Sequence, residues 1–238
     1  MLSIKIYNIY NVCTYYVYVS CHTHIEKIKT YSYMIVHIVG NIGCGKTSIL
    51  KKIIESSTNN NYIITSYDLE CHNCTENLQI QNMYFEECLC RLIHGHKEYL
   101  AAITSPAKYI FTEECVQSTN KILAQKMCQT RRISTEQYDL FKNIVDIQLS
   151  NDNMTKLNNS VVVYVKTDPS FCLSNVHSRK SKKNDFHWDL ASLMDIHEKY
   201  EDWIQNDVVA EKVITVYNTE HETIDSITKK IVNEIIRL

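Results

Sequence analysis

Residues 40–47 read Gly40-Asn41-Ile42-Gly43-Cys44-Gly45-Lys46-Thr47, which fits the pattern G-x-x-x-x-G-K-[ST] of phosphate-binding loops. The loop follows the apolar, β-branched run Met34–Val39, which predicts a buried parallel strand. It precedes Ser48–Ile54, where apolar residues recur at helical spacing. A strand, a glycine loop and a helix in this order predict a nucleoside triphosphate site.

The residue types of this loop suit an anion. Glycine permits backbone angles that a Cβ blocks, so successive N–H groups can turn toward a phosphate. The N-terminus of the following helix adds a partial positive charge. We expect Lys46 to reach the terminal phosphates and the Thr47 hydroxyl to bind Mg²⁺. ATP and Mg²⁺ are therefore the expected cofactors, with residues 40–47 as the loop that binds them.

The composition narrows the class of partner. The 238 residues carry 25 Lys+Arg against 27 Asp+Glu, a formal net charge of -2, so no positive field favours nucleic acid or a membrane surface. Ten cysteines would fit a secreted disulfide framework, but a triphosphate site belongs in a reducing compartment, so we expect free thiols and a cytoplasmic protein. Cys71-His72-Asn73-Cys74 has the spacing of half a zinc site, but no clear second pair completes it.

The first 33 residues differ from the rest of the chain because they are rich in tyrosine. Polar and tyrosine residues interrupt the apolar stretch that a signal peptide needs, and the segment lacks the roughly 20 apolar residues of a membrane span. We therefore expect residues 1–33 to be a poorly ordered, dispensable extension before a single domain at 34–238.

From Met34 onward, strand and helix patterns alternate. Strands are expected at 34–39, 62–67, 109–112, 160–165 and 212–217. Helices are expected at 46–56, 78–104, 118–129, 134–150, 169–178, 188–206 and 222–237. Short strands separated by helices predict a five-stranded parallel sheet with helices on both faces, the three-layer α/β fold of a P-loop kinase.

Several segments resemble the deoxynucleoside kinase family of the deoxycytidine, deoxyguanosine and mitochondrial thymidine kinase type. The pair Asn41-Ile42 matches the family's loop E-G-N-I-x-x-G-K-[ST] more specifically than the general motif does. The other matching segments, in chain order, are Phe85–Arg91, Phe111–Ser118, Asp168–Leu173 with Arg179, Trp203, and Tyr217–Glu220. The resemblance covers residues 34–238 and implies the family's fold and a homodimer.

The resemblance also implies which residues act. The family's catalytic base is a carboxylate after the second strand, which indicates Glu70 or Asp68, with Glu70 favoured. Glu113 matches the glutamate of the family's E-R-S motif and is implied to be catalytic and to contact the metal and the substrate. Arg91 matches an arginine beside the substrate, and Tyr84 falls where the family reads the nucleobase with a glutamine. Because Tyr84 differs from that glutamine, no nucleobase preference is carried over.

Position 114 departs from the family. The family has an arginine there, near the phosphate, whereas this chain has Glu114. The exchange changes the local charge by two units, and like charges a few ångström apart in a partly desolvated site repel by several kcal/mol. Three outcomes stay open: Arg91, Arg131 or Arg132 compensates, the register differs, or activity is weakened or lost.

The basic run Arg179-Lys180-Ser181-Lys182-Lys183 follows the helix expected at 169–178. It lies where the family has a closing lid, whose cations neutralise the transferring phosphate and whose closure excludes water. We expect a short basic lid in which Arg179 is catalytic and contacts ATP, helped by Lys183 or Lys182.

The expected function is ATP-dependent phosphorylation of the 5′-hydroxyl of a deoxynucleoside, with Lys46, Glu70, Glu113 and Arg179 as catalytic residues. The first alternative is a kinase-derived nucleotide-binding protein with weakened or lost catalysis, which Glu114 and Tyr84 favour. The second is a nucleoside monophosphate kinase, which has a similar loop and lid.

Overall fold

A computed structural model describes residues 33–56, 62–65, 84–85, 88–89, 92–93, 107–151, 160–178, 188–208 and 210–238, with residues 62–65 and 148–151 described by their backbone alone. Residues Ser32–Leu238 form one compact unit, and Met1–Tyr31 are assigned to another. The expected N-terminal extension lies outside the described residues, except for Tyr33.

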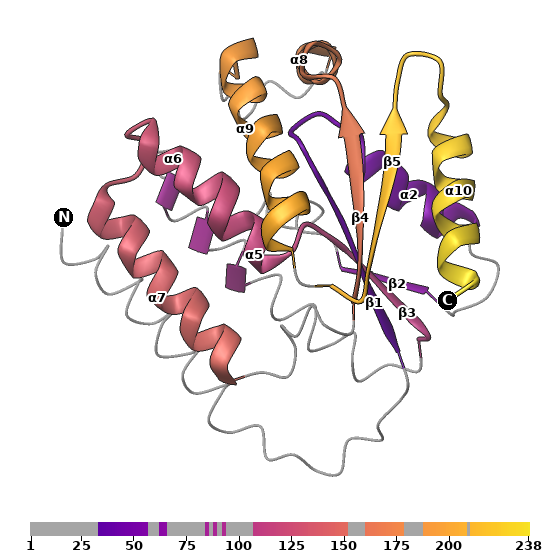
Figure 1. The fold of residues 1–238 in the computed structure, drawn as a ribbon, viewed down its shortest axis with the longest axis horizontal. Coiled ribbons are helices and arrows are strands. Elements are labelled where there is room, and N and C mark those ends of the chain that lie inside the picture. The colour runs from indigo at the N-terminus through magenta and orange to yellow at the C-terminus, as the bar shows by residue number, and fades with distance from the viewer. Residues whose placement is uncertain are drawn as a thin grey trace. The chain divides into compact units, whose positions relative to one another are not determined.

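The unit is built on a parallel sheet (Figure 1). Its strands are β1 (Met34–Gly40), β2 (Tyr62–Thr65), β3 (Tyr109–Glu113), β4 (Ser160–Thr167) and β5 (Lys212–Asn218). The backbone pairs them in the order β2-β3-β1-β4-β5, and each neighbouring pair is parallel. The body of this sheet is formed by β3, β1, β4 and β5, whose side chains are described. Strand β2 lies at one edge. The predicted α/β architecture with a parallel sheet is therefore confirmed.

Helices connect the strands. They are α2 (Lys46–Ser56), α5 (Val116–Ser118), α6 (Gln125–Gln129), α7 (Thr135–Asn151), α8 (Pro169–Ser178), α9 (Leu190–Asp202) and α10 (Ile224–Ile236). Two π-helical segments, η1 (Thr119–Ala124) and η4 (Trp203–Asp207), continue α5 and α9. Pro169 begins α8 because its fixed φ suits the first helical position. The side chain of Asp189 caps α9 by accepting a hydrogen bond from the Ser192 N–H.

Each face of the sheet carries its own apolar core, as the alternation of side chains along a strand requires. Val161, Val163 and Val165 of β4 pack with α2 and α10 on one face. Val162 and Tyr164 of the same strand pack with α9 and η1 on the other face. Figure 1 shows α2 and α10 on one side of β4 and β5, and α9 on the other. This arrangement is the helix–sheet–helix layering predicted from the sequence.

A third apolar cluster lies among the helices. The described positions of the helix expected at 78–104 are helical, and they bury Phe85, Cys88 and Leu92. These side chains pack against Phe141 and Val145 of α7. The spacing of the three buried residues fits one helical face, as the sequence pattern predicts.

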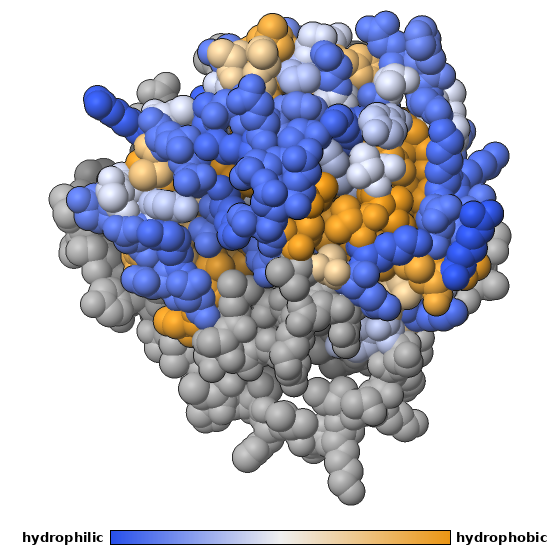
Figure 2. Space-filling view, in the orientation of Figure 1, coloured by the Kyte–Doolittle hydropathy of each residue, from blue (hydrophilic) through white to orange (hydrophobic). Residues whose placement is uncertain are grey.

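The surface follows from this layering. Figure 2 shows mainly hydrophilic residues over α9 and α10, with hydrophobic residues gathered between them, over β4 and β5. The apolar side chains therefore belong chiefly to the sheet and to the inner faces of the helices, and the sheet is the fixed platform from which the loops at the strand ends project.

Candidate functional site

The glycine loop joins β1 to α2 in a conformation that side chains would block. Gly43 has φ +83°, and a Cβ there would lie 2.4 Å from the carbonyl oxygen of Cys172 in α8. Gly45 has φ +100°, and a Cβ there would lie 3.0 Å from Nδ2 of Asn218. Both positions therefore need glycine for their backbone angle and for the close approach of α8 and β5.

Side chains from other elements hold the loop carbonyls. The Cys44 carbonyl oxygen accepts hydrogen bonds from Asn218 Nδ2 at 2.8 Å and from Thr167 Oγ1 at 3.4 Å. The Gly43 carbonyl oxygen accepts one from Asn175 Nδ2 at 3.0 Å. Because these carbonyls are bound on the side of β4, β5 and α8, the loop is fixed before any ligand arrives.

Asn41 ties the loop to α9. Its side chain is buried, its Nδ2 donates to the Leu193 carbonyl at 2.8 Å, and its Oδ1 accepts from the Ile42 N–H at 2.8 Å. An asparagine supplies both the donor and the acceptor that this position uses. The Asn-Ile pair singled out in the sequence therefore has a structural role in shaping the loop.

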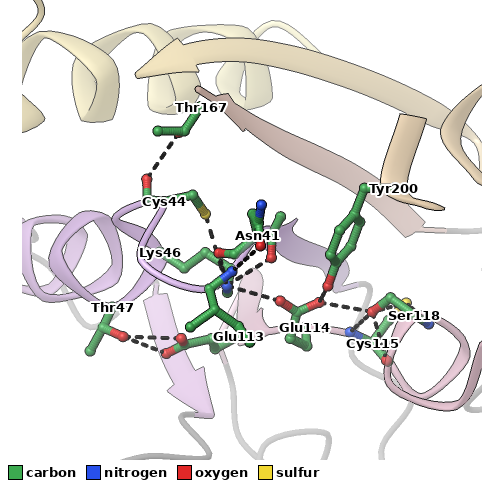
Figure 3. A network of polar contacts seen from close by, with 12 residues as sticks. Asn41, Cys44, Lys46, Thr47, Glu113, Glu114, Cys115, Ser118, Thr167 and Tyr200 are labelled. Carbon is green, nitrogen blue, oxygen red and sulfur yellow. Dashed lines mark hydrogen bonds and ion pairs between the residues drawn. The ribbon is translucent and has the colours of Figure 1, made fainter. Parts of the chain in front are cut away.

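Thr47, in the first turn of α2, meets Glu113 at the carboxyl edge of the sheet. Glu113 is paired in register with Ile38 of β1, two residues before the loop. The Thr47 hydroxyl donates to both carboxylate oxygens of Glu113, at 3.0 Å each (Figure 3). The carboxyl edge of a parallel sheet is where α/β proteins bind ligands.

The oxygen ligands of Thr47 and Glu113 fit Mg²⁺, which takes one or two protein oxygens and completes its shell with water and substrate phosphates. The described residues contain no group of three or more His, Cys, Asp or Glu that could hold a metal ion on its own. A metal held at Thr47 and Glu113 would therefore need ligands from a nucleotide and from water.

Lys46 is buried at the centre of a polar network (Figure 3). Its Nζ donates to the carbonyl oxygens of Gly40 and Asn41, each at 2.9 Å, and lies 3.1 Å from Glu114 Oε1. Burial alone would lower the pKa of this ammonium, but the carboxylates of Glu114 and Glu113 oppose burial, and that pKa is raised above its usual value. The lysine is therefore charged at neutral pH.

Glu114 finds its counter-charge in Lys46, a partner that the sequence did not predict. Of the three arginines that could compensate, Arg91 lies outside the described residues, and Arg131 is described and exposed. The Arg132 guanidinium lies instead over the rings of Trp188 at 4.7 Å and Tyr84 at 5.7 Å. Glu114 stands directly after Glu113 at the end of β3, and its contact with Lys46 places its carboxylate inside the site.

The Cys44 thiol carries no charge into the loop, because burial raises its pKa. The described cysteines Cys44, Cys88, Cys115, Cys128 and Cys172 are free thiols, which agrees with the expectation from the sequence. The half zinc site at Cys71–Cys74 lies outside the described residues.

Several predicted site residues also lie outside the part of the chain that the structure describes. They are the candidate bases Asp68 and Glu70, the substrate-side Arg91, and the lid residues Arg179, Lys182 and Lys183. Their roles stay predictions. The described site thus brings together the loop, Lys46, Thr47, Glu113 and Glu114. It adds Ser118 and Tyr200, which sequence reasoning did not assign to it.

Comparison with known proteins decides the family. A family model described as deoxynucleoside kinase matches residues 36–238. The chain belongs to the deoxynucleoside kinase family. No curated protein matches this deoxynucleoside kinase family member. The predicted resemblance is therefore confirmed at the level of the family, which contains kinases, a class of transferases, that act on nucleosides.

Kinases of such a family generally use ATP and Mg²⁺. In the described part of the chain, no helix combines the length and the apolar character that crossing a membrane requires.

Proposed function

We propose that the chain transfers the γ-phosphoryl group of ATP to the 5′-hydroxyl of a deoxynucleoside, which yields a deoxynucleoside monophosphate and ADP. The observation that carries the proposal is the contact of Thr47 with Glu113 beside a preformed glycine loop. A hydroxyl and a carboxylate at the mouth of a phosphate-binding loop are what a nucleotide-bound metal needs. Family membership supplies the substrate class.

The loop residues bind and orient the triphosphate in this proposal. The backbone N–H groups of residues 40–47 surround the phosphates, and the Lys46 ammonium contacts the terminal ones. Thr47 and Glu113 hold the metal. Mg²⁺ supplies charge neutralisation across the β- and γ-phosphates when it is bound.

The chemical step needs a base near the acceptor. We assign it to Glu70, with Asp68 as the alternative. The 5′-oxygen forms a bond to the γ-phosphorus, the bond from that phosphorus to the bridging β-oxygen breaks, and the carboxylate takes the hydroxyl proton. The leaving group is ADP, so atoms and charge balance without another reactant.

The remaining predicted residues have supporting roles. We propose that Arg179 and Lys183 contact the transferring phosphate from the lid and that Arg91 and Tyr84 line the acceptor site. Tyr84 is half-buried, packs against the cluster of Phe85 and Phe141, and has the Arg132 guanidinium over its ring. Further proposals are that the protein is a cytoplasmic homodimer and that residues 1–33 are dispensable.

A second candidate is a nucleotide-binding protein with weakened catalysis. The observation that favours it is the ion pair of Lys46 with Glu114, which places an extra carboxylate beside the loop where the family has an arginine. A third candidate, a nucleoside monophosphate kinase, rests on the glycine loop and on the lid expected from the sequence.

One assay separates the three candidates. The full chain is incubated with ATP, Mg²⁺ and each of the four deoxynucleosides, and in parallel with the four deoxynucleoside monophosphates. Monophosphate formed from a deoxynucleoside supports the proposal. ATP binding without turnover supports the binding protein, and diphosphate formed from a monophosphate supports the third candidate.

A further inference from the structure

The Lys46 ammonium already uses all three of its N–H groups. An ammonium has three donors, and here its acceptors are the Gly40 carbonyl at 2.9 Å, the Asn41 carbonyl at 2.9 Å and Glu114 Oε1 at 3.1 Å. The Cys44 sulfur at 3.9 Å is a fourth and weak neighbour. For the lysine to contact a phosphate, one of the three strong contacts has to be given up.

Glu114 is held firmly in its position. Its backbone has φ 66°, a conformation that is unusual for a residue with a Cβ. Its N–H donates to the Ile38 carbonyl at 2.9 Å, and its carbonyl oxygen accepts from Thr112 Oγ1 at 2.9 Å. The backbone that carries this carboxylate is therefore fixed by β1 and β3.

The second carboxylate oxygen is held from two helices (Figure 3). Glu114 Oε2 accepts from the Tyr200 hydroxyl of α9 at 2.8 Å and from Ser118 Oγ of α5 at 2.8 Å. Tyr200 is fully buried and Ser118 is buried as well, so neither donor exchanges freely with water. If Glu114 turned away from Lys46, the Ser118 hydroxyl could still donate to the Cys115 carbonyl at 3.0 Å, but the buried Tyr200 hydroxyl would lose its acceptor, which is costly.

We propose that Glu114 competes with the phosphates of the nucleotide for Lys46, so that the ion pair must open when a nucleotide binds and the affinity for polyphosphate is lower than the loop alone would give. The lysine moves and the glutamate stays, because Lys46 has a flexible four-carbon stem and Glu114 is anchored on both sides. The inference rests on the proposed function only for the statement that the loop binds a nucleotide. It concerns binding and not turnover.

The test is the binding of Mg–ATP and of Mg–tripolyphosphate to the full chain, measured by isothermal titration calorimetry. Glu114→Gln removes the charge and keeps an oxygen acceptor. We expect this variant to bind both ligands about tenfold more tightly than the wild type, by an equal factor, because the effect acts on the phosphates. Equal or weaker binding by Glu114→Gln, or a gain for ATP alone, would overturn the proposal.

Glu201→Gln is the matched control. Glu201 also pairs with a lysine, Lys166, and accepts from a tyrosine hydroxyl, that of Tyr164 at 2.7 Å, but these contacts join α9 to β4 and do not include the loop. We expect its affinities to equal those of the wild type. A gain as large as that of Glu114→Gln would contradict the assignment of the effect to Lys46.

Glu114→Asp decides the question if Glu114→Gln does not fold. Its shorter side chain draws the carboxylate away from Lys46 but keeps the charge. We therefore expect both ligands to bind about threefold more tightly than to the wild type, an affinity between those of the wild type and Glu114→Gln. No gain in a folded Glu114→Asp variant would overturn the proposal. If neither the wild type nor the folded variants bind either ligand, the proposed function fails along with this inference. If the wild type binds and the variants bind no more tightly, the inference alone is overturned.

Discussion

The Thr47 hydroxyl lies 3.0 Å from both carboxylate oxygens of Glu113, although 66 positions of sequence separate the two residues. The parallel pairing of β1 with β3 closes that separation, because both strands end at the same edge of the sheet. The glycine loop then turns the chain into α2, where Thr47 is the second residue. The contact therefore depends on the fold and not on local sequence.

Replacing Glu113 by Gln tests this contact. The amide removes the negative charge that a metal needs but can still accept a hydrogen bond from Thr47. We expect kcat/KM for phosphorylation to fall about 100-fold and the Mg²⁺ requirement to rise, as steady-state rates over a range of Mg²⁺ concentrations would show. Glu55→Gln, on the exposed face of α2, the helix that carries Thr47, is the control. An unchanged Mg²⁺ dependence in Glu113→Gln would rule out the assignment.

The loop tolerates no side chain at Gly43. In Gly43→Ala the new Cβ would require a positive φ and would meet the Cys172 carbonyl. We expect a loss of about 2–5 kcal/mol in the free energy of unfolding, from left-handed strain and overpacking together. Urea denaturation followed by circular dichroism measures it, with the exposed neighbour changed in Ser48→Ala as the control. A Gly43→Ala chain as stable as wild type would show that α8 does not pack there.

Local patterns predicted the regular elements well. Helices α2 and α8 have the bounds expected from the sequence, because the glycine loop and Pro169 mark where each helix starts. Strands β3 and β4 are longer than expected, ending at Glu113 and Thr167, because backbone pairing continues after the apolar pattern stops. The helix expected at 188–206 starts two residues later, after its cap Asp189, and ends in a π-helical turn.

The polar network of the site could not be predicted in the same way. Lys46 and Glu114 each have a recognisable position in a motif, but their ion pair joins a loop to the end of a different strand. Tyr200 comes from a third element and carries no local signal, because a tyrosine on the apolar face of a helix usually means core packing. Such contacts are fixed by tertiary structure, which neither periodicity nor motif spacing encodes.

The Tyr200 hydroxyl should contribute to stability through Glu114. Tyr200→Phe removes one donor to a buried carboxylate without changing the ring, so we expect the free energy of unfolding to fall by about 1.5–3 kcal/mol. Chemical denaturation measures this change. The control is Tyr217→Phe, whose residue is 60% exposed, and it should stay within about 0.5 kcal/mol of the wild type. Equal effects of the two changes would contradict the network.

The stability should also depend on pH through His37. Burial lowers the pKa of His37 to about 4 from 6.5, although its Nδ1 lies 2.6 Å from Thr112 Oγ1 and the nearby Glu114 carbonyl opposes the shift. The unfolded chain therefore takes up the proton first as the pH falls. The contribution of His37 to the free energy of unfolding should be complete above pH 6.5. It should decline by up to about 3 kcal/mol between pH 6.5 and about 4, and it should not change further below about pH 4.

The variant His37→Gln isolates that contribution. Urea unfolding at about pH 7, pH 6 and pH 5 should give a smaller decline for His37→Gln than for the wild type. The exposed His221, changed to Gln, is the control and should keep the wild-type decline. If the free energy of unfolding of His37→Gln declined as much as that of the wild type, the proton uptake would belong to another group.

Transfer of label from [γ-³²P]ATP to a deoxynucleoside tests the account most directly. The wild-type chain with Mg²⁺ should place the label on the 5′-oxygen of at least one of the four deoxynucleosides, and the control Ser48→Ala should do the same. The rate of label transfer by Lys46→Ala should be lower by a factor of at least about 100. Label transfer by Lys46→Ala at the wild-type rate, or none by a wild-type chain that binds Mg–ATP, would contradict the account.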